Sequence, residues 1–246
     1  VRVLQPEKLK SPEFLEELKS LRADLQVVVA FRMLPEIVWS MPPLGTFNLH
    51  SSLLPQYRGA APINWAVING ESETGVSTFF IEKDIDTGKI IFQEKEPIFP
   101  NDDAGSLYER LMVKGAALVS KTVGAIADGD YPQQDQDEPE NIKAAPKIFR
   151  ETCQIDWNKT SREVHNFVRG LSPYPAAWTT LNGLSCKIFK TALAESDEND
   201  EPGAFRTDHK SYLHFRTSDG WISIETLQLE GKKRLNIAEF LRGNKL

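Results

Sequence analysis

Three residues of this chain stand at spacings that suit acid–base chemistry. Asn48 and His50 alternate with apolar residues at the end of a predicted strand, so their side chains should project from one face of it. An amide can donate hydrogen bonds to an oxyanion without titrating, and an imidazole can transfer a proton near neutral pH. Asp86 lies in the turn 84–88, from which a carboxylate could orient that imidazole.

The same residue types also have structural uses. Asparagine and histidine cap loops, and an Asp-x-x-Gly sequence forms turns, so the spacing alone leaves both interpretations open. The sequence contains no nucleophile elbow, phosphate-binding loop or dinucleotide fingerprint. Its 4 histidines are scattered and its 2 cysteines lack a C-x-x-C spacing, so we expect neither a metal site nor a disulfide scaffold.

The first half of the chain reads as an α/β domain. Residues 25–30 form a β-branched run with almost no polar position, which is typical of a strand covered on both faces in a parallel sheet. Further strands are predicted over 44–50, 75–81 and 89–95, and a long helix over 104–128. Because Val1 begins in what reads as the end of a strand, we expect the N-terminal part of this domain to be missing.

The composition changes after residue 130. Prolines among Gln, Asp and Glu mark residues 132–150 as a linker, so we predict a catalytic domain over 1–131 and a second domain over 151–246. In the second domain, short strands with turn signals between them predict a small β-barrel. These strands are expected at 176–181, 184–194, 204–206, 212–216 and 221–229, with a helix at 236–242.

Composition and charge limit the class of protein. With 246 residues, 40% hydrophobic residues and a net charge of −6, the chain is an ordinary globular protein, and its longest apolar run is too short for a membrane span. The charge is nevertheless unevenly distributed. Acidic residues gather in the predicted loop 195–201, whereas Lys232, Lys233 and Arg234 form a basic turn that could attract phosphate, although it could also be an ordinary solvated surface.

One long stretch resembles a known family. Residues 47–62, FNLHSSLLPQYRGAAP, resemble the signature of the folate-dependent formyltransferases, and ETGV at 73–76 and DTG at 86–88 follow at the family's spacing. Within this superfamily, the segments 58–62, 155–157, 172–178 and 230–234 most resemble the methionyl-tRNA formyltransferases. The resemblance covers essentially the whole chain. It implies a Rossmann-like catalytic domain followed by a C-terminal OB-like β-barrel.

The resemblance also implies an activity. The donor would be 10-formyltetrahydrofolate, and the acceptor would be the α-amino group of methionine on initiator tRNA, for translation initiation. Asn48 would bind the oxyanion, His50 would assist proton transfer, and Asp86 would hold His50 and help to remove the amine proton. The family's folate-binding positions map onto Ser52, Leu53, Leu54, Pro55, Arg32, Met33, Leu34, Asp84 and Ile85. The basic turn at Lys232, Lys233 and Arg234 would contact the tRNA.

Some features depart from the family pattern and leave alternatives. The segment 30–35 is one residue shorter than in most methionyl-tRNA formyltransferases and is closer to the glycinamide ribonucleotide enzymes, and Asp84 stands where glycine is common. An amino-sugar nucleotide formyltransferase is the main alternative, and a non-catalytic RNA-binding protein is a remote one. We expect a monomer that works in the reducing cytoplasm, without a metal.

Overall fold

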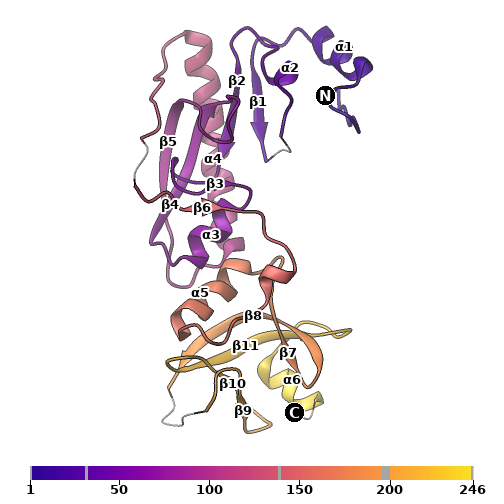
Figure 1. The fold of residues 1–246 in the computed structure, drawn as a ribbon, viewed down its shortest axis with the longest axis vertical. Coiled ribbons are helices and arrows are strands. Elements are labelled where there is room, and N and C mark those ends of the chain that lie inside the picture. The colour runs from indigo at the N-terminus through magenta and orange to yellow at the C-terminus, as the bar shows by residue number, and fades with distance from the viewer. Residues whose placement is uncertain (1, 31–32, 138–139, 196–199, 245) are drawn as a thin grey trace. The chain divides into compact units, whose positions relative to one another are not determined.

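The computed structural model describes residues 2–30, 33–137, 140–195, 200–244 and 246. They form two compact units (Figure 1), and the chain passes between the units several times. Unit 1 comprises Val1–Pro62, Thr74–Glu96 and Leu111–Ala144, and unit 2 comprises Ile63–Glu73, Pro97–Arg110 and Ala145–Leu246. The division therefore differs from the predicted one in two ways. Two excursions from the first half of the chain belong to unit 2, and the segment 132–144 belongs to unit 1.

The sheet of unit 1 contains four strands in the order β1-β2-β4-β5. They are β1 (Gln26–Val29), β2 (Thr46–His50), β4 (Glu73–Phe80) and β5 (Ile90–Pro97). β1 runs parallel to β2, but β2 runs antiparallel to β4. The sheet is thus mixed rather than parallel throughout.

The prediction that the strand over residues 25–30 is covered on both faces is wrong for the edge strand β1. Val27 and Val29 are 41% and 54% exposed, whereas Gln26 and Val28 are half-buried. Only one face of β1 is therefore covered by the part of the chain that the structure describes. A β-branched run favours a strand, but it does not reveal whether an element packs on both of its faces.

The described residues of the first half of the chain form four helices. They are α1 (Pro12–Ser20), α2 (Glu36–Trp39), α3 (Pro62–Ile68) and α4 (Ala104–Asp128). The hydroxyl of Ser11 accepts a hydrogen bond from the Phe14 N–H and caps α1. Asp103 similarly accepts a bond from the Ser106 N–H at the start of α4, and the bounds of α4 agree with those expected from the sequence.

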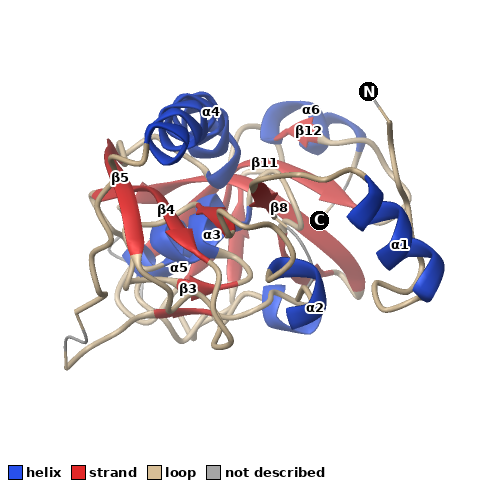
Figure 2. Cartoon of the chain, turned by 90° about the horizontal axis from the view of Figure 1, so that it is seen from above, coloured by secondary structure: helices blue, strands red, loops and turns tan. Residues whose placement is uncertain are grey.

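Helix α4 determines which way β2 faces. Gly115 of α4 is buried, and a Cβ added to it would lie 2.8 Å from Cδ2 of Leu49 on β2. Phe47, also on β2, packs with Ile91 and Ile126 on this same side. The two views agree that α4 lies along one face of β4 and β5 (Figure 2). Because side chains alternate along a strand, Asn48 and His50 project from the opposite face.

Unit 2 is built on a six-stranded sheet. Its elements are η1 (Glu151–Cys153), α5 (Ser161–Leu171), β7 (Ala177–Leu181), β8 (Leu184–Ala194), β9 (Phe205–Thr207), β10 (Leu213–Arg216), β11 (Trp221–Leu229), β12 (Leu235–Asn236) and α6 (Ile237–Gly243). The strand order is β7-β8-β11-β10-β9, with β12 also on β11. The predicted strands are confirmed, but the described pairings do not close them into a barrel. Asn182 and Gly183, between β7 and β8, both adopt positive φ, as a type I′ hairpin turn requires.

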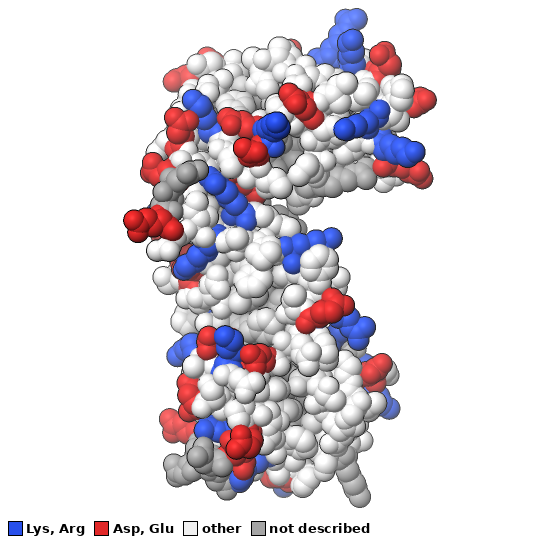
Figure 3. Space-filling view, viewed as in Figure 1, with Lys and Arg blue, Asp and Glu red and all other residues white. Residues whose placement is uncertain are grey.

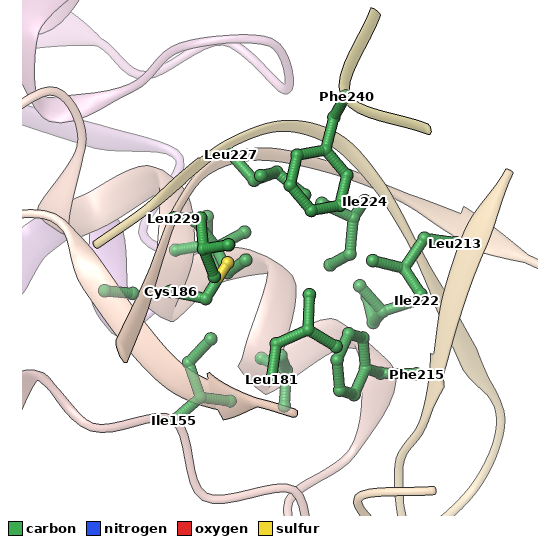
Figure 4. Close-up of a cluster of buried hydrophobic side chains, with 14 of the residues drawn as sticks. Ile155, Leu181, Cys186, Leu213, Phe215, Ile222, Ile224, Leu227, Leu229 and Phe240 are labelled. Atoms are coloured by element: carbon green, nitrogen blue, oxygen red, sulfur yellow. The ribbon is translucent and has the colours of Figure 1, made fainter. Parts of the chain in front are cut away.

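The core of unit 2 lies between this sheet and its helices. Figure 4 shows Phe240 of α6 above Leu227 and Ile224 of β11, with Leu181 and Phe215 pointing into the same cluster. The excursions of the chain are tied to α5 by polar contacts. Arg169 Nη1 donates to the carbonyl oxygen of Asp102 at 3.0 Å, and Asn64 Nδ2 donates to the carbonyl oxygen of Gly170 at 2.7 Å.

The side chain of Asp102 anchors the second excursion. Arg110 donates to its two carboxylate oxygens at 2.8 and 2.7 Å, a bidentate geometry that is among the strongest of polar contacts. Burial opposes ionisation of Asp102, but hydrogen bonds from Arg110, the Phe99 N–H and Ser106 outweigh it and lower the pKa of the carboxyl. The ion pair therefore persists well into the acidic range.

The packing of α4 on β2 predicts a contrast between two glycines of one helix. Gly115→Leu places a side chain against Leu49 in a filled interior, and such overpacking costs about 1–3 kcal/mol of the free energy of unfolding. At the exposed Gly124, where an added Cβ meets nothing within 4 Å, the same substitution should gain up to about 1 kcal/mol from helix propensity. Urea unfolding of the two variants measures both effects. Equal stabilities would contradict the described packing.

Candidate active site

The face of β2 opposite α4 carries Asn48 and His50. In the register with β4, Asn48 lies across from Phe79 and His50 across from Ser77. His50 is 7% exposed, and its ring meets that of Phe79 edge-on with centroids 6.4 Å apart. Asn48 is half-buried. Asn48 and His50, two residues apart on β2, therefore lie on the same face of the strand.

Both ring nitrogens of His50 have defined neighbours. Nε2 lies 2.8 Å from the carbonyl oxygen of Tyr57, and because a carbonyl can only accept, Nε2 carries a proton. Nδ1 lies 3.8 Å from Oδ2 of Asp86. That distance exceeds a hydrogen bond, but it places the imidazole and the carboxylate within ion-pair range of each other.

Asp86 is fixed by the backbone around it. Its φ is +56°, so the residue adopts the left-handed conformation that aspartate tolerates in turns. Oδ2 accepts a hydrogen bond of 2.9 Å from the N–H of Gly59, and the side chain is only 15% exposed. The same carboxylate oxygen therefore faces both His50 and β3 (Arg58–Gly59).

Asn48 has an uncommitted side chain. The residues that the structure describes contain no hydrogen-bond partner for its amide. A half-buried amide without an internal partner is available to a ligand. The structure thus brings His50 and Asp86 together directly and places Asn48 beside His50 on the same face of β2.

The segment predicted to bind folate is held from within the protein. The Ser52 hydroxyl donates to the carbonyl oxygen of Gln56 at 2.6 Å, and Leu54 is buried against Phe79 and Ile90. Leu53 and Pro55 are half-buried. Ser52 and Leu54 thus point into the protein, whereas Leu53 and Pro55 remain partly accessible to a ligand.

Ser77 holds this segment to the sheet. Its hydroxyl donates to the Ser52 carbonyl oxygen at 2.6 Å and accepts from the Leu54 N–H at 3.2 Å and from Gln93 Nε2 at 2.8 Å. All of this occurs at a fully buried position. Ser77 also stands directly across from His50. Nothing in the sequence marks Ser77, because a serine inside an apolar strand carries no motif.

The remaining predicted folate positions lie nearer the surface. Met33 is 74% exposed and Ile85 is 60% exposed. Asp84 is exposed and Leu34 is half-buried. Arg32 lies outside the described residues. All of these positions stay predictions.

The basic turn lies in unit 2, between β11 and β12. Lys232, Lys233 and Arg234 are all exposed, and the Arg234 guanidinium stacks over the Phe189 ring at 4.0 Å. On the visible face of unit 2, basic and acidic side chains are interspersed (Figure 3). The acidic positions 197 and 198 lie outside the described residues, so the expected orientation of the loop 195–201 stays a prediction.

Two backbone groups of the site could not be identified from residue types. The Tyr57 carbonyl and the Gly59 N–H contact His50 and Asp86, but main-chain groups leave no residue-type signature. Gly59, at φ +127°, adopts a conformation that only glycine reaches readily. The only indication of its importance in the sequence is that Gly59 lies in the segment 58–62, which resembles the methionyl-tRNA formyltransferases.

Metal and thiol chemistry find little support in the described structure. No group of three or more His, Cys, Asp or Glu residues is placed to hold a metal ion within the described residues. Cys153 and Cys186 are buried and unpaired. Burial raises the pKa of the Cys186 thiol to about 12, so this sulfur is not a nucleophile at neutral pH.

Comparisons with known proteins decide the family. The sequence profile "Formyl transferase" matches residues 2–123, and "Formyl transferase, C-terminal domain" matches residues 147–245. A curated methionyl-tRNA formyltransferase from Azobacteroides pseudotrichonymphae is 56% identical, over 99% of this chain and 78% of its own length. The chain belongs to the formyl transferase family. A second methionyl-tRNA formyltransferase, from Flavobacterium johnsoniae, is 50% identical, over 98% of this chain and 78% of its own length.

Solved structures support the fold. HypX from Aquifex aeolicus, crystallised in complex with tetrahydrofolic acid, superposes with a TM-score of 0.70 at 22% identity. That match covers 94% of this chain but only 41% of HypX. WlaRD, a sugar 3N-formyl transferase, gives a TM-score of 0.65 at 27% identity, over 88% of this chain and 77% of its own. None of the helices in the described part of the chain is long and apolar enough to cross a membrane.

The hydrogen bonds of Ser77 predict a stability effect next to the site. Ser77→Ala removes the acceptor of the Leu54 N–H and the donor to the Ser52 carbonyl, so the free energy of unfolding should fall by about 1–3 kcal/mol. The matched control is Ser120→Ala on the exposed side of α4, which should change it by less than about 0.5 kcal/mol. Denaturant titration compares the two. A Ser77→Ala protein as stable as the control would remove this serine from the support of the site.

Proposed function

We propose that this chain transfers a formyl group from 10-formyltetrahydrofolate to the α-amino group of methionyl-initiator-tRNA. The observation that carries the proposal is the placement of His50 and Asp86 3.8 Å apart beside the Asn48 amide, which has no hydrogen-bond partner among the described residues. The chain is also 50–56% identical to curated methionyl-tRNA formyltransferases over nearly its full length. Residue types, geometry and similarity therefore agree on one activity.

The three residues divide the reaction between them. As the neutral amine nitrogen attacks the formyl carbon, the carbonyl oxygen gains negative charge, and the Asn48 amide donates a hydrogen bond to it. The proton lost by the amine passes to the His50–Asp86 pair. When the new amide forms, the bond between the formyl carbon and the folate nitrogen breaks, and the pair returns a proton to that nitrogen.

We assign the donor substrate to the face of β2 that carries His50. We assign the folate to the edge formed by Leu53 and Pro55, with its pterin between Met33, Leu34 and the turn at Asp84 and Ile85. Apolar atoms on that path remain accessible, since Met33 and Ile85 are more than half exposed. A flat aromatic ring system gains free energy in such a setting. No metal is required, because a proton rather than a Lewis acid assists the leaving nitrogen.

The second unit would bind the tRNA. We assign it as an OB-like domain whose basic turn, Lys232 to Arg234, meets the phosphate backbone, because these side chains are exposed and Lys and Arg are the usual partners of phosphate. The two free cysteines suit the reducing cytoplasm, where translation begins. We assign a monomer as the working state.

An amino-sugar nucleotide formyltransferase is the competing function, since WlaRD shares the fold at 27% identity. Formyl transfer from 10-formyltetrahydrofolate should be measured with methionyl-tRNA and with a nucleotide-linked amino sugar in parallel. We expect turnover of methionyl-tRNA only. Turnover of the sugar nucleotide alone would overturn the proposal.

The role of Asn48 predicts a selective loss of turnover. Asn48→Ala should lower kcat by about 10²–10³-fold, the effect of removing one oxyanion donor. KM should change far less, because the oxyanion exists only near the transition state. The exposed Asn101 provides the control variant Asn101→Ala. Steady-state kinetics that show an effect on KM alone would move Asn48 from catalysis to ground-state binding.

The role of the basic turn predicts a change in salt dependence. Each phosphate contact contributes a slope of about 0.7–0.9 to the fall of log affinity with log salt. Replacing Lys232, Lys233 and Arg234 by alanine should therefore weaken tRNA binding and flatten the slope by up to about two or three units. Folate binding should not change.

A charge-matched variant provides the control for this experiment. Lys8, Lys10 and Lys19 are exposed residues of unit 1, and replacing them by alanine alters the net charge equally. Because Arg234 stacks on Phe189, the double variant of Lys232 and Lys233 should be measured as well. Salt slopes that stay equal in all variants would show that the turn is only a solvated surface.

A further inference from the structure

The segment predicted as a linker is fastened to unit 1 next to the site. Ile90 and Gln134 exchange both backbone hydrogen bonds, at 2.8 and 3.0 Å. Lys89 and Asp135 form an ion pair of 3.5 Å. These contacts fix the register of the segment against β5, so the position of residue 136 is determined by the fold.

Gln136 uses its whole side-chain amide in this position. Nε2 donates to the carbonyl oxygens of Asp86 at 2.8 Å and Gly88 at 2.9 Å. Oε1 accepts from Nε and Nη2 of Arg58 at 3.1 and 2.7 Å. Both amide hydrogens and both lone pairs are therefore engaged. Gln136 is half-buried, whereas its neighbours Gln133 and Asp137 are exposed.

The hydrogen-bond partners of Gln136 belong to the two segments that position Asp86. One is the turn that presents Asp86, held at φ +56°. The other contains Arg58, whose neighbour Gly59 donates its N–H to the Asp86 carboxylate. A single amide thus links the turn that carries the carboxylate to the strand that orients it.

We propose that Gln136 is a positioning residue that sets the Asp86 carboxylate against His50 by binding the Asp86 turn and Arg58 together. It acts only through Asp86, because its own amide is fully occupied by protein groups. This inference rests on the proposed formyl transfer for its kinetic consequence. Its geometric part, the dependence of the His50–Asp86 arrangement on Gln136, stands independently.

The kinetic experiment compares Gln136→Ala with Gln133→Ala in the full chain. Misplacing a catalytic group by about 1 Å can cost on the order of 10²-fold, so Gln136→Ala should lower kcat by about 10–100-fold and leave both KM values within about twofold. Gln133→Ala, an exposed glutamine three residues away, should match the unchanged protein.

Two further variants separate positioning from general destabilisation. Gln136→Glu keeps the acceptor for Arg58 but removes both donors to the turn, so it should lose as much kcat as Gln136→Ala. In an Asp86→Asn background, Gln136→Ala should lower kcat by less than about twofold, because residues that act as one unit are not additive. A full additional loss in that background would overturn the proposal, as would a fully active Gln136→Glu.

A readout without turnover distinguishes this inference from the proposed function. The ring nitrogen resonances of His50, observed by NMR in the free protein, should move in Gln136→Ala and stay in place in Gln133→Ala. Unmoved resonances would overturn the positioning role even if the enzyme formylates methionyl-tRNA. Moved resonances in a protein that does not formylate methionyl-tRNA would overturn the proposed function alone.

Discussion

The alternation of side chains along β2 is the constraint on which the rest of this structure depends. Phe47 and Leu49 must meet α4, where Gly115 leaves room for a leucine. Because successive residues point to opposite faces, this packing forces Asn48 and His50 to the other side. A shift of one residue in register would turn Asn48 and His50 toward α4 and the apolar pair away from it. The packing of the hydrophobic core therefore also determines which face carries Asn48 and His50.

Around that strand, the backbone does much of the positioning. The Tyr57 carbonyl fixes one nitrogen of His50, and the Gly59 N–H fixes one oxygen of Asp86. Main-chain groups are held by the fold and do not change rotamer, so the geometry that they impose costs little to maintain. The side chain of Asn48 has no hydrogen-bond partner among the residues that the structure describes, which is what the proposed role of binding substrate requires.

Local patterns in the sequence predicted most of the helices and strands. They did not predict how segments that are distant in the sequence pair and pack. The bounds of α4 and the strands of unit 2 followed from periodicity and turn residues such as Asn182 and Gly183. The sequence could not show that β2 and β4 run antiparallel, that Val27 and Val29 face outward, or that residues 132–144 belong to unit 1. Each of these depends on which distant segment comes to lie alongside. Residue type and spacing made Asn48, His50 and Asp86 candidates, and the family resemblance assigned them roles. Gln136 lies in a polar stretch where one glutamine among three resembles the others.

The interleaved path of the chain has a consequence for how this protein can be divided or recombined. The chain crosses between its two units five times, and the excursions 63–73 and 97–110 find their partners in α5, through Asn64 on Gly170 and Arg169 on Asp102. A cut within 132–150 would therefore strip both excursions of those contacts, although that segment resembles a tether in the sequence. Replacing the C-terminal region with that of another protein would also require substitutions in residues 63–73 and 97–110, which contact it. Substitutions in the two parts of the sequence are therefore expected to be coupled.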